Sequence, residues 1–286
     1  MTPKLTIRPM TSSEVQLALD WAAQEGWNPG LHDATSFYAT DPAGFLIAEL
    51  EGEQIGCISV VRYNSKFGFI GLYIVKPQWR GLGYGLQLWQ TAWQQLISRL
   101  DSENFSIGLD GVLEKESTYH QAGFTAAYRH VRYVYEPISS NSVPSDVISL
   151  TDVPLKQIIL YDTKFFPASR PQFLSPWIHF AEAAYGIVSG DRLCGYGVLR
   201  SCRQGFKIGP LFADTFEIAD SLFRALTYHA EGQPVFIDIP DVQPALPVLI
   251  QRYCLESVFT CVRMYRGNVP NLDVERIFGV TTLELG

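Results

Sequence analysis

The stretch that decides the fold is Val75-Lys-Pro-Gln-Trp-Arg-Gly-Leu-Gly-Tyr-Gly85. It follows an apolar run, 67–75, that predicts a strand, and it leads into a pattern, 84–100, that predicts an amphipathic helix. Closely spaced glycines let backbone N–H groups approach an anion without obstruction, and a helix start adds free N–H groups and a positive dipole end. The stretch therefore predicts a diphosphate cradle, with a glycine-rich turn that binds nothing as the alternative. It does not match the G-x-G-x-x-G of dinucleotide folds, and no G-K-[ST] of a P-loop follows.

Length and composition indicate two globular domains. The chain has 286 residues, of which 47% are hydrophobic and 18% charged. These values exclude a disordered tail or a charged coiled coil, and either half is long enough to bury a core. The net charge of −7 argues against nucleic acid as a partner and suits an amine-bearing substrate.

The sequence gives no sign of a metal site, a disulfide framework or a membrane span. The five cysteines include no C-x-x-C pair, and the five histidines are scattered. No apolar run reaches the ~18 residues of a transmembrane helix, and no signal-peptide pattern is present. We therefore expect a cytoplasmic protein without a metal; secretion by a route that reads other signals would leave no trace here.

The order of predicted elements is α/β, and it occurs twice. We expect a first domain at 1–137, a polar, proline-containing linker at 138–146 and a second domain at 147–286. Aligning Gly209 with Gly71 gives an offset of 138, whereas aligning Asp238 with Asp110 gives 128. Between these two aligned positions the second copy is thus about ten residues shorter than the first. The segment that the second copy lacks is the glycine-rich stretch. In the first copy, helix 84–100 is expected to bury a stripe of Leu86, Trp89, Trp93 and Leu96.

A strand ending in Val-x-Pro, then Arg80-x-x-Gly83-x-Gly85 opening a helix, resembles motif A of the GNAT superfamily of N-acyltransferases. Tyr119-His-Gln-Ala-Gly123-Phe124 resembles the Y-x-x-x-G-F that ends the fourth helix of that family. The second half resembles the C-terminal half of tandem GNAT proteins, without the R-x-x-G-x-G loop. The resemblance implies two tandem folds, each a mixed, mostly antiparallel sheet flanked by helices.

The resemblance also implies acetyl-CoA as the cosubstrate. In this family the pantetheine arm lies along the free edge of the fourth strand, here the backbone of Tyr73, Ile74 and Val75. The residues implied to hold the pyrophosphate or to shape its loop are Arg80, Gly81, Leu82, Gly83, Tyr84, Gly85 and Leu86. The second domain is not expected to bind CoA in the usual way.

Two residues are candidates for the chemistry. Tyr119 matches the family's general acid for the departing thiolate, or it only packs on Phe124. Asp110, at the end of the fifth strand, is the first candidate for the base; it could instead bind the substrate ammonium or cap a turn. His120 and Glu49 are weaker candidates for the base.

The leading hypothesis is an acetyl-CoA-dependent N-acetyltransferase, active in the first domain, that acts on the amine of a small molecule or a protein. One alternative is a module that binds CoA or a protein partner without turnover, with the C-terminal domain as the candidate surface for a protein partner. Another is catalysis by an atypical site in the second domain. Trp21, Trp27, Phe37 and Tyr38 are expected in an acceptor pocket or in the core. Phe165, Phe166, Arg170 and Trp177 are expected at the domain interface, which an acceptor site could share.

Overall fold

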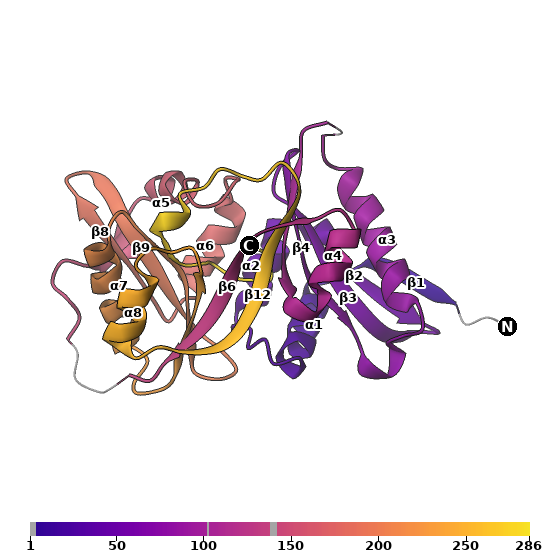
Figure 1. The fold of residues 1–286 in the computed structure, drawn as a ribbon, viewed down its shortest axis with the longest axis horizontal. Coiled ribbons are helices and arrows are strands. Elements are labelled where there is room, and N and C mark those ends of the chain that lie inside the picture. Colours follow the sequence, from indigo (N-terminus) through magenta and orange to yellow (C-terminus); the bar gives the residue numbers. More distant parts are fainter. Residues whose placement is uncertain (1–3, 102, 138–141) are drawn as a thin grey trace.

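One continuous sheet runs through both halves of the chain (Figure 1). The computed structural model describes residues 4–101, 103–137 and 142–286. Within these residues the strands are β1 (Leu5–Pro9), β2 (Phe45–Leu50), β3 (Glu53–Arg62), β4 (Phe67–Val75), β5 (Ser106–Val112), β6 (Thr125–Tyr135), β7 (Ile148–Ser149), β8 (Ala183–Ser189), β9 (Arg192–Ser201), β10 (Phe206–Ala213), β11 (Val235–Pro240), β12 (Glu256–Gly267) and β13 (Ile277–Gly279). The helices are α1 (Ser12–Gln24), α2 (Asp33–Thr40), α3 (Tyr84–Ile97), α4 (Glu116–Gln121), α5 (Leu155–Asp162), α6 (Pro171–His179), α7 (Phe216–Tyr228) and α8 (Leu246–Tyr253).

The order of strands reveals an exchange between the halves. Along the sheet the order is β1-β2-β3-β4-β5-β12-β6-β11-β10-β9-β8-β7, and β13 pairs with β10. β12 from the second half therefore pairs with β5 of the first, while β6 from the first half pairs with β11 of the second. The exchanged strands also pair with each other, at the middle of the molecule (Figure 1). The sequence did not predict this exchange.

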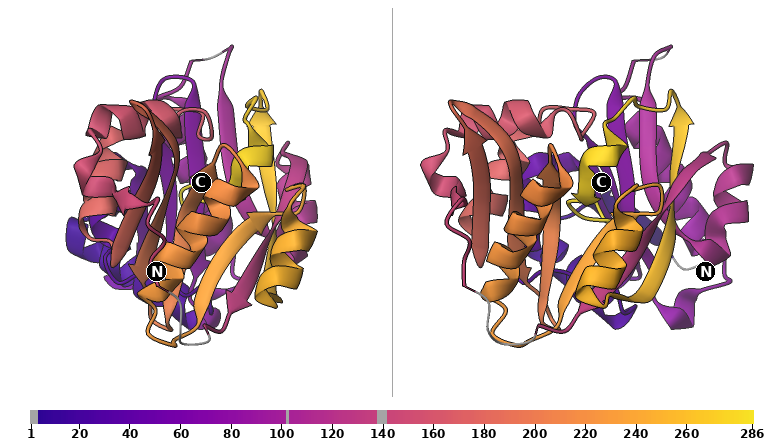
Figure 2. Two further views of the ribbon diagram at one scale, coloured as in Figure 1. Left: turned by 90° about the vertical axis from the view of Figure 1, so that its left-hand side faces the viewer. Right: turned by 60° about the vertical axis from the view of Figure 1, so that its left-hand side comes forward.

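The pairing directions confirm the predicted fold class. Only β4 with β5 and β10 with β11 are parallel among the described strand pairs; the others are antiparallel. Figure 2 shows helices on both faces of the sheet. The internal repeat is also visible, because the parallel pairing ends at Ile70 opposite Leu109 in one half and at Ile208 opposite Ile237 in the other.

The helices of the first half illustrate how local sequence sets structure. Thr11 and Glu14 form a capping box at the start of α1, as that sequence pattern favours. The buried stripe of α3 differs from the prediction: it is Leu88, Ala92 and Leu96, with Trp89 and Trp93 only half-buried beside it, and Leu86 is 60% exposed. The helix begins at Tyr84, so Leu86 lies in its first turn, next to the glycine-rich loop.

The two halves share a hydrophobic core. The ring of Phe37 on α2 stacks on Trp177 of α6 at a centroid distance of 6.2 Å. Trp21 is buried in the same core and Tyr38 packs against it, so neither lines an acceptor pocket. The residues predicted at the interface, Phe165, Phe166, Arg170 and Trp177, are all buried. Phe166 and Trp177 contact aromatic rings of the first half, whereas Phe165 packs on rings of the second half and Arg170 pairs with Asp162 of the second half.

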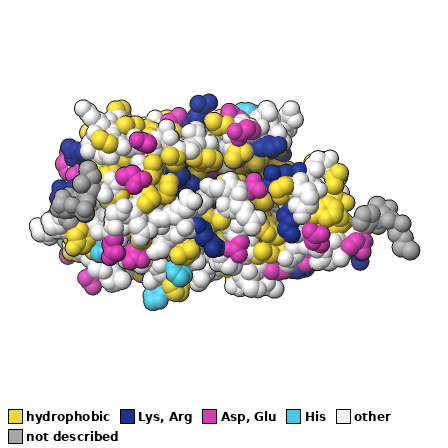
Figure 3. All heavy atoms as spheres, turned by 90° about the horizontal axis from the view of Figure 1, so that it is seen from below, with side chains coloured by type: hydrophobic (Ala, Val, Ile, Leu, Met, Phe, Trp, Pro, Cys, Tyr) yellow, Lys and Arg dark blue, Asp and Glu magenta, His cyan; other side chains and the backbone are white. Residues whose placement is uncertain are grey.

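The surface shown in Figure 3 mixes charges of both signs, with Lys and Arg side chains among Asp and Glu. In the part of the chain that the structure describes, none of the helices combines the length and apolar character needed to cross a bilayer.

Candidate active site

A cavity of about 660 Å³ lies where β4 and β5 separate. Beyond Ile70, the edge of β4 that faces β5 has no strand partner among the described residues. Tyr73, Ile74 and Val75 lie on this stretch and line the cavity, as predicted. The free edge offers backbone N–H and C=O groups to an extended ligand that adds to the sheet like another strand.

A β-bulge interrupts β4 beside the cavity. Cys57 of β3 pairs with Ile74 and Ser59 with Gly71, so β4 carries one residue more than β3 over this interval. Leu72 takes a left-handed backbone conformation with φ 46°, and its carbonyl accepts a hydrogen bond from Cys57 Sγ at 3.2 Å. Bulges reorient the backbone groups around them and are common next to active sites.

The glycine-rich loop borders the cavity beyond the end of β4. Gly81 and Gly83 have φ values of 76° and 85°, which other residues adopt only with strain, and Gly83 is the N-cap of α3. A Cβ atom at Gly85 would lie 2.8 Å from the Tyr73 hydroxyl. Of the loop residues predicted to hold pyrophosphate, those lining the cavity are Arg80, Gly81 and Gly85, whereas Leu82, Gly83, Tyr84 and Leu86 lie beside it in the loop and in the first turn of α3.

Arg80 ties the loop to the end of β4. Its Nε donates to the Val75 carbonyl at 2.7 Å, and its guanidinium forms an ion pair with Glu25 at the end of α1. These contacts agree with a role for Arg80 in shaping the loop.

Tyr119 on α4 also lines the cavity. Its ring packs against Trp89 and Phe124, with centroid distances of 5.8 and 6.4 Å. Burial raises the pKa of the phenol to about 12, and the neighbouring Tyr73 adds to the shift. The ring thus packs against the core, as one of the two alternatives predicted, and the hydroxyl borders the cavity and stays protonated at neutral pH; the role of general acid remains a prediction.

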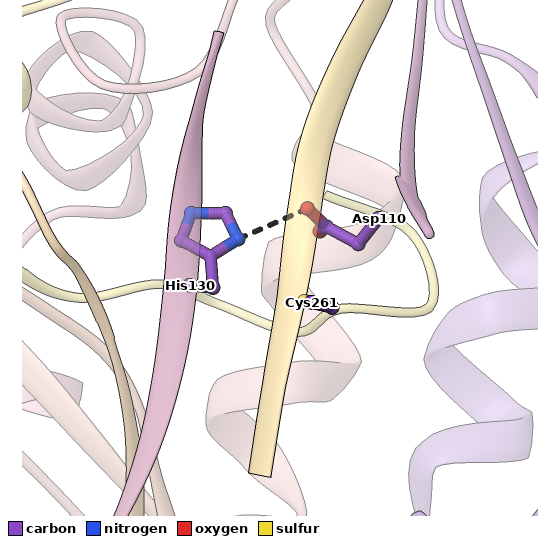
Figure 4. Close-up of side chains that lie close together, drawn as sticks. All are labelled: Asp110, His130 and Cys261. Carbon is purple, nitrogen blue, oxygen red and sulfur yellow. Dashed lines mark hydrogen bonds and ion pairs between the residues drawn. The ribbon is translucent and has the colours of Figure 1, made fainter. Parts of the chain in front are cut away.

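Asp110 is buried in an ion-pair network rather than capping a turn. Its two oxygens accept from Arg263 Nε and Nη2 at 2.8 and 2.6 Å, and Oδ1 lies 3.0 Å from His130 Nδ1 (Figure 4). Burial alone would raise the pKa of Asp110, but the charges of Arg263 and His130 outweigh it and hold the pKa below its ordinary value. Asp110 borders the cavity, yet its charge is already compensated.

Cys261 lies close to Asp110 and His130, so that one possible donor atom from each falls within 4.8 Å of the others (Figure 4). Arg263 nevertheless occupies both Asp110 oxygens, and burial raises the pKa of the Cys261 thiol. A metal would need a free carboxylate and a thiolate here. The donor set therefore fits a charge-paired network better than a cation site.

The Arg263→Met variant should be about 3–5 kcal/mol less stable than the wild type, because the substitution leaves a buried carboxylate without its main partner. Urea unfolding at neutral pH measures the loss. Since the pKa of Asp110 is depressed in the folded state, the pair's contribution is present at neutral pH and is lost as the pH falls through that depressed value. Arg252→Met, which breaks a more exposed pair with Asp220, should cost much less stability than Arg263→Met; equal costs would contradict the argument.

The two weaker candidates for the base lie outside the cavity wall. His120 Nδ1 is 2.9 Å from the Phe124 carbonyl, and its Nε2 faces Glu116. Glu49 pairs with Arg8 of β1.

Several cavity residues were not found from the sequence. Some, such as Glu25, Glu114 and Lys115, come from the first half itself, and Trp27 was only one of four aromatic candidates. Five others lie on the exchanged strands or in the C-terminal segment: Arg132, Phe259, Cys261, Leu283 and Glu284. No motif marks these positions. Their proximity follows from the strand exchange, which local patterns do not encode.

The equivalent cleft of the second half is filled by the chain itself. There β10 separates from β11 after Ile208, and Leu211 and Phe212 pair with β13. With the offset of 138, these residues correspond to Tyr73 and Ile74 of the first half. A Cβ atom at Gly209 would lie 2.3 Å from the Thr281 carbonyl, which shows how closely the C-terminal segment fills this cleft.

Comparisons with known proteins agree with this geometry. Residues 13–109 match the profile of the "Acetyltransferase (GNAT) family", and residues 158–279 match that of the "Acetyltransferase (GNAT) domain". The chain is 32% identical over 284 residues to "Holothin acyltransferase" of Pseudoalteromonas sp. (strain SANK 73390), which covers 98% of this chain and 94% of the relative.

Two solved structures share the tandem arrangement over nearly the whole chain. One, from Pyrococcus horikoshii, has a TM-score of 0.79 and 24% identity and covers 99% of this chain and 96% of its own. The other, "Tandem GNAT protein from the clavulanic acid biosynthesis pathway", has a TM-score of 0.61 and 12% identity and covers 94% of this chain and 100% of its own.

Proposed function

The chain belongs to the GNAT family of acyltransferases and carries two copies of its fold, and from this premise we propose that the first half transfers the acetyl group of acetyl-CoA to a primary amine. One observation carries the proposal. The cleft of the first half is open from the glycine-rich loop to the fork of β4 and β5, whereas β13 fills the corresponding cleft of the second half. Only the first half retains the glycine-rich loop.

The donor would bind along this open cleft. Backbone groups of Tyr73, Ile74 and Val75 would pair with the pantetheine arm, and the amide groups of Gly81 to Leu86 would hold the pyrophosphate at the start of α3. The acyl carbonyl would then lie near the bulge in β4, where a backbone N–H at Ile74 can stabilise the oxyanion.

The reaction proceeds by direct attack of the amine on the thioester in a ternary complex. The nitrogen–carbon bond forms, the carbon–sulfur bond breaks, and the departing thiolate takes a proton from the Tyr119 hydroxyl. Because Asp110 is held by Arg263 and His130, we propose that it positions the wall formed by β5, β12 and β6 instead of accepting the amine proton directly.

The second half would shape the acceptor site. Trp27 lines the cavity, and the loop that carries it is held from the second half: Lys207 Nζ donates to the Asn28 carbonyl at 2.9 Å, and Leu31 N donates to the Ser201 carbonyl at 2.9 Å. The exchanged strand β6 adds a hydrogen bond of 2.7 Å from Arg132 Nη1 to the Trp27 carbonyl. This arrangement explains why the degenerate copy is needed.

The first acceptor to test is holothin, the molecule in the name of the full-length relative. Release of the CoA thiol from acetyl-CoA would be followed with holothin and then with a library of primary amines. Turnover with one of them supports the proposal. Acetyl-CoA binding without turnover for any amine would favour a binding module.

The Gly83→Glu variant should bind acetyl-CoA at least about 30-fold more weakly, because its side chain brings a negative charge to the pyrophosphate cradle. Thermal unfolding with acetyl-CoA measures this, since ligand at ~100 times its Kd adds about 2.7 kcal/mol to stability. We expect the wild type to shift by several degrees and Gly83→Glu by about a third of that shift or less.

Gly52→Glu is the matched control. Gly52 also has a positive φ, of 86°, and an open surround, but it lies in the β2–β3 turn. This variant should bear the same backbone strain and keep the full acetyl-CoA shift. If Gly83→Glu also keeps the shift, acetyl-CoA binds elsewhere and the placement in the first half is wrong.

A further inference from the structure

We propose that Glu284 receives the acceptor amine and takes its proton, and that the acceptor is a small monoamine with an apolar body. The inference rests on the proposed function and adds to it a catalytic residue and a substrate class. Glu284 belongs to the second half, so the active site is incomplete without the C-terminal segment.

Glu284 is held at the fork of the sheet. Its backbone carbonyl packs so closely on Gly71, the residue after β4 leaves β5, that a Cβ atom there would lie 1.9 Å from the oxygen. The segment around it is anchored: Tyr63 Oη donates to the Leu285 carbonyl at 2.9 Å, and Arg170 Nη2 donates to Thr281 Oγ1 at 2.8 Å. The backbone of Glu284 is thus fixed at the fork, and the residue lines the cavity in which the acyl group is proposed to bind.

The charge of Glu284 distinguishes it from the other carboxylates of the cavity. Asp110 pairs with Arg263 and Glu25 pairs with Arg80, while Glu114 is exposed. Glu284 is only 6% exposed; Thr282 Oγ1 donates to its Oε2, and within the described residues no cationic atom lies within 4.0 Å of it. Burying an unpaired carboxylate is costly, so the site favours a ligand that brings a positive or hydrogen-bond-donating nitrogen.

The cations around Glu284 have partners of their own. Arg132 pairs with Asp238 and Arg200 with Asp33, both buried. Lys207 donates to the main-chain carbonyl of Asn28, in the loop that carries Trp27, and burial lowers the pKa of Lys207. These cations are held by other partners, and none of them forms an ion pair with Glu284 within the described residues.

Most of the wall contributed by the exchanged strands, the C-terminal segment and the loop of Trp27 is apolar. Trp27, Phe259, Leu283 and Cys261 line the cavity, and Arg132 adds a cation whose guanidinium lies 5.6 Å from the Phe259 ring centroid. One uncompensated buried carboxylate suits one amine, whereas a polyamine or an aminoglycoside would need several. The volume of about 660 Å³ lies in the range of small-molecule sites and must also hold the pantetheine arm.

The proton balance of the reaction closes with these residues. An amine that arrives as the ammonium ion first gives up one proton, which passes through Glu284 to solvent. The neutral nitrogen then attacks the thioester carbon and, in the tetrahedral adduct, loses a second proton to Glu284. The carbon–sulfur bond then breaks, and Tyr119 protonates the thiolate. Solvent returns the proton from Glu284 to Tyr119, so the products are an amide and the CoA thiol.

The Glu284→Gln variant tests the role of the carboxylate. With the fastest amine from the turnover screen, kcat/KM should fall about 100-fold. The thermal shift with acetyl-CoA should stay unchanged. Glu275→Gln, the same substitution at an exposed position of the same segment, should match the wild type.

Three further results decide the proposal. If Glu284→Gln keeps kcat/KM within about threefold of the wild type, the proposal is wrong even where Gly83→Glu abolishes turnover. Should Glu284→Gln fail to fold, the Glu284→Asp variant replaces it, because aspartate keeps the carboxylate but withdraws it by one methylene group. A normal thermal shift with acetyl-CoA together with slower turnover supports the role of Glu284. Unchanged turnover rejects it. Phenethylamine should exceed spermidine and kanamycin about tenfold in kcat/KM, and the reverse order would reject the substrate class.

Discussion

Residues 1–137, expressed without the rest of the chain, are expected not to reach the native fold. In the intact protein β5 is covered by β12, and β6 lies between β12 and β11. Without the second half, β5 keeps only β4 as a partner, and β6 loses both of its neighbours. An open edge of this kind favours association or aggregation over a stable monomer.

Two reciprocal ion pairs strengthen this expectation. Asp110 of β5 binds Arg263 of β12, and Asp238 of β11 binds Arg132 of β6, with nitrogen–oxygen distances of 2.6 and 2.7 Å. Asp110 and Asp238 occupy equivalent positions in the two copies of the fold, and so do the exchanged strands β6 and β12. Separation of the halves would therefore leave four buried charges without partners, each pair costing several kcal/mol.

Circular dichroism and size-exclusion chromatography of the isolated 1–137 fragment measure the outcome. We expect no cooperative thermal transition, and either an unfolded profile or aggregates. Co-expression of 1–137 with 142–286 is the control, because it supplies both strands and cuts the chain only at the predicted linker; the two fragments should associate and bind acetyl-CoA. A monomeric 1–137 fragment with a cooperative transition would contradict the importance of the exchange.

The contrast between prediction and structure has a physical basis. The glycine-rich loop, the strand before it and the capped start of α1 depend on nearby residues, so local patterns predict them well. Strand exchange differs, because β6 and β12 have the same pattern and each could pair within its own half. Hydrophobic alternation specifies which face of a strand is buried but not which copy it joins.

The candidate site divides in the same way. Tyr73, Ile74, Val75, Arg80, Gly81, Gly85, Asp110 and Tyr119 were found from the sequence because they belong to a continuous motif or follow its strand order, and all line the cavity. Glu284 and Phe259 lie more than a hundred residues away and reach the cavity through the C-terminal segment and β12. Asp110 was found from the sequence, but its ion-pair partner was not. Arg263 holds the carboxylate of Asp110 and comes from the other half of the chain.

The Tyr119→Phe variant should lose about 10²- to 10⁴-fold in kcat, the usual range for removal of a general acid. A thiolate leaves more readily when a phenol protonates it, and the substitution removes only the hydroxyl. The ring would keep its contacts with Trp89 and Phe124, so stability and acetyl-CoA binding should change little. Because burial raises the pKa of Tyr119 to about 12, the wild type should lose no activity to its ionisation between pH 6 and about 10.

Single-turnover rates with saturating acetyl-CoA separate this effect from binding. Tyr228→Phe, a matched change at an exposed residue on α7, should leave both kcat and the acetyl-CoA thermal shift unaltered. If Tyr119→Phe retains the wild-type rate, the residue serves the packing of Trp89 and Phe124 alone, and the thiolate leaves unassisted or takes its proton from water. A slow variant that still binds acetyl-CoA would instead place the acid of the reaction on the first half, opposite the carboxylate that the second half contributes.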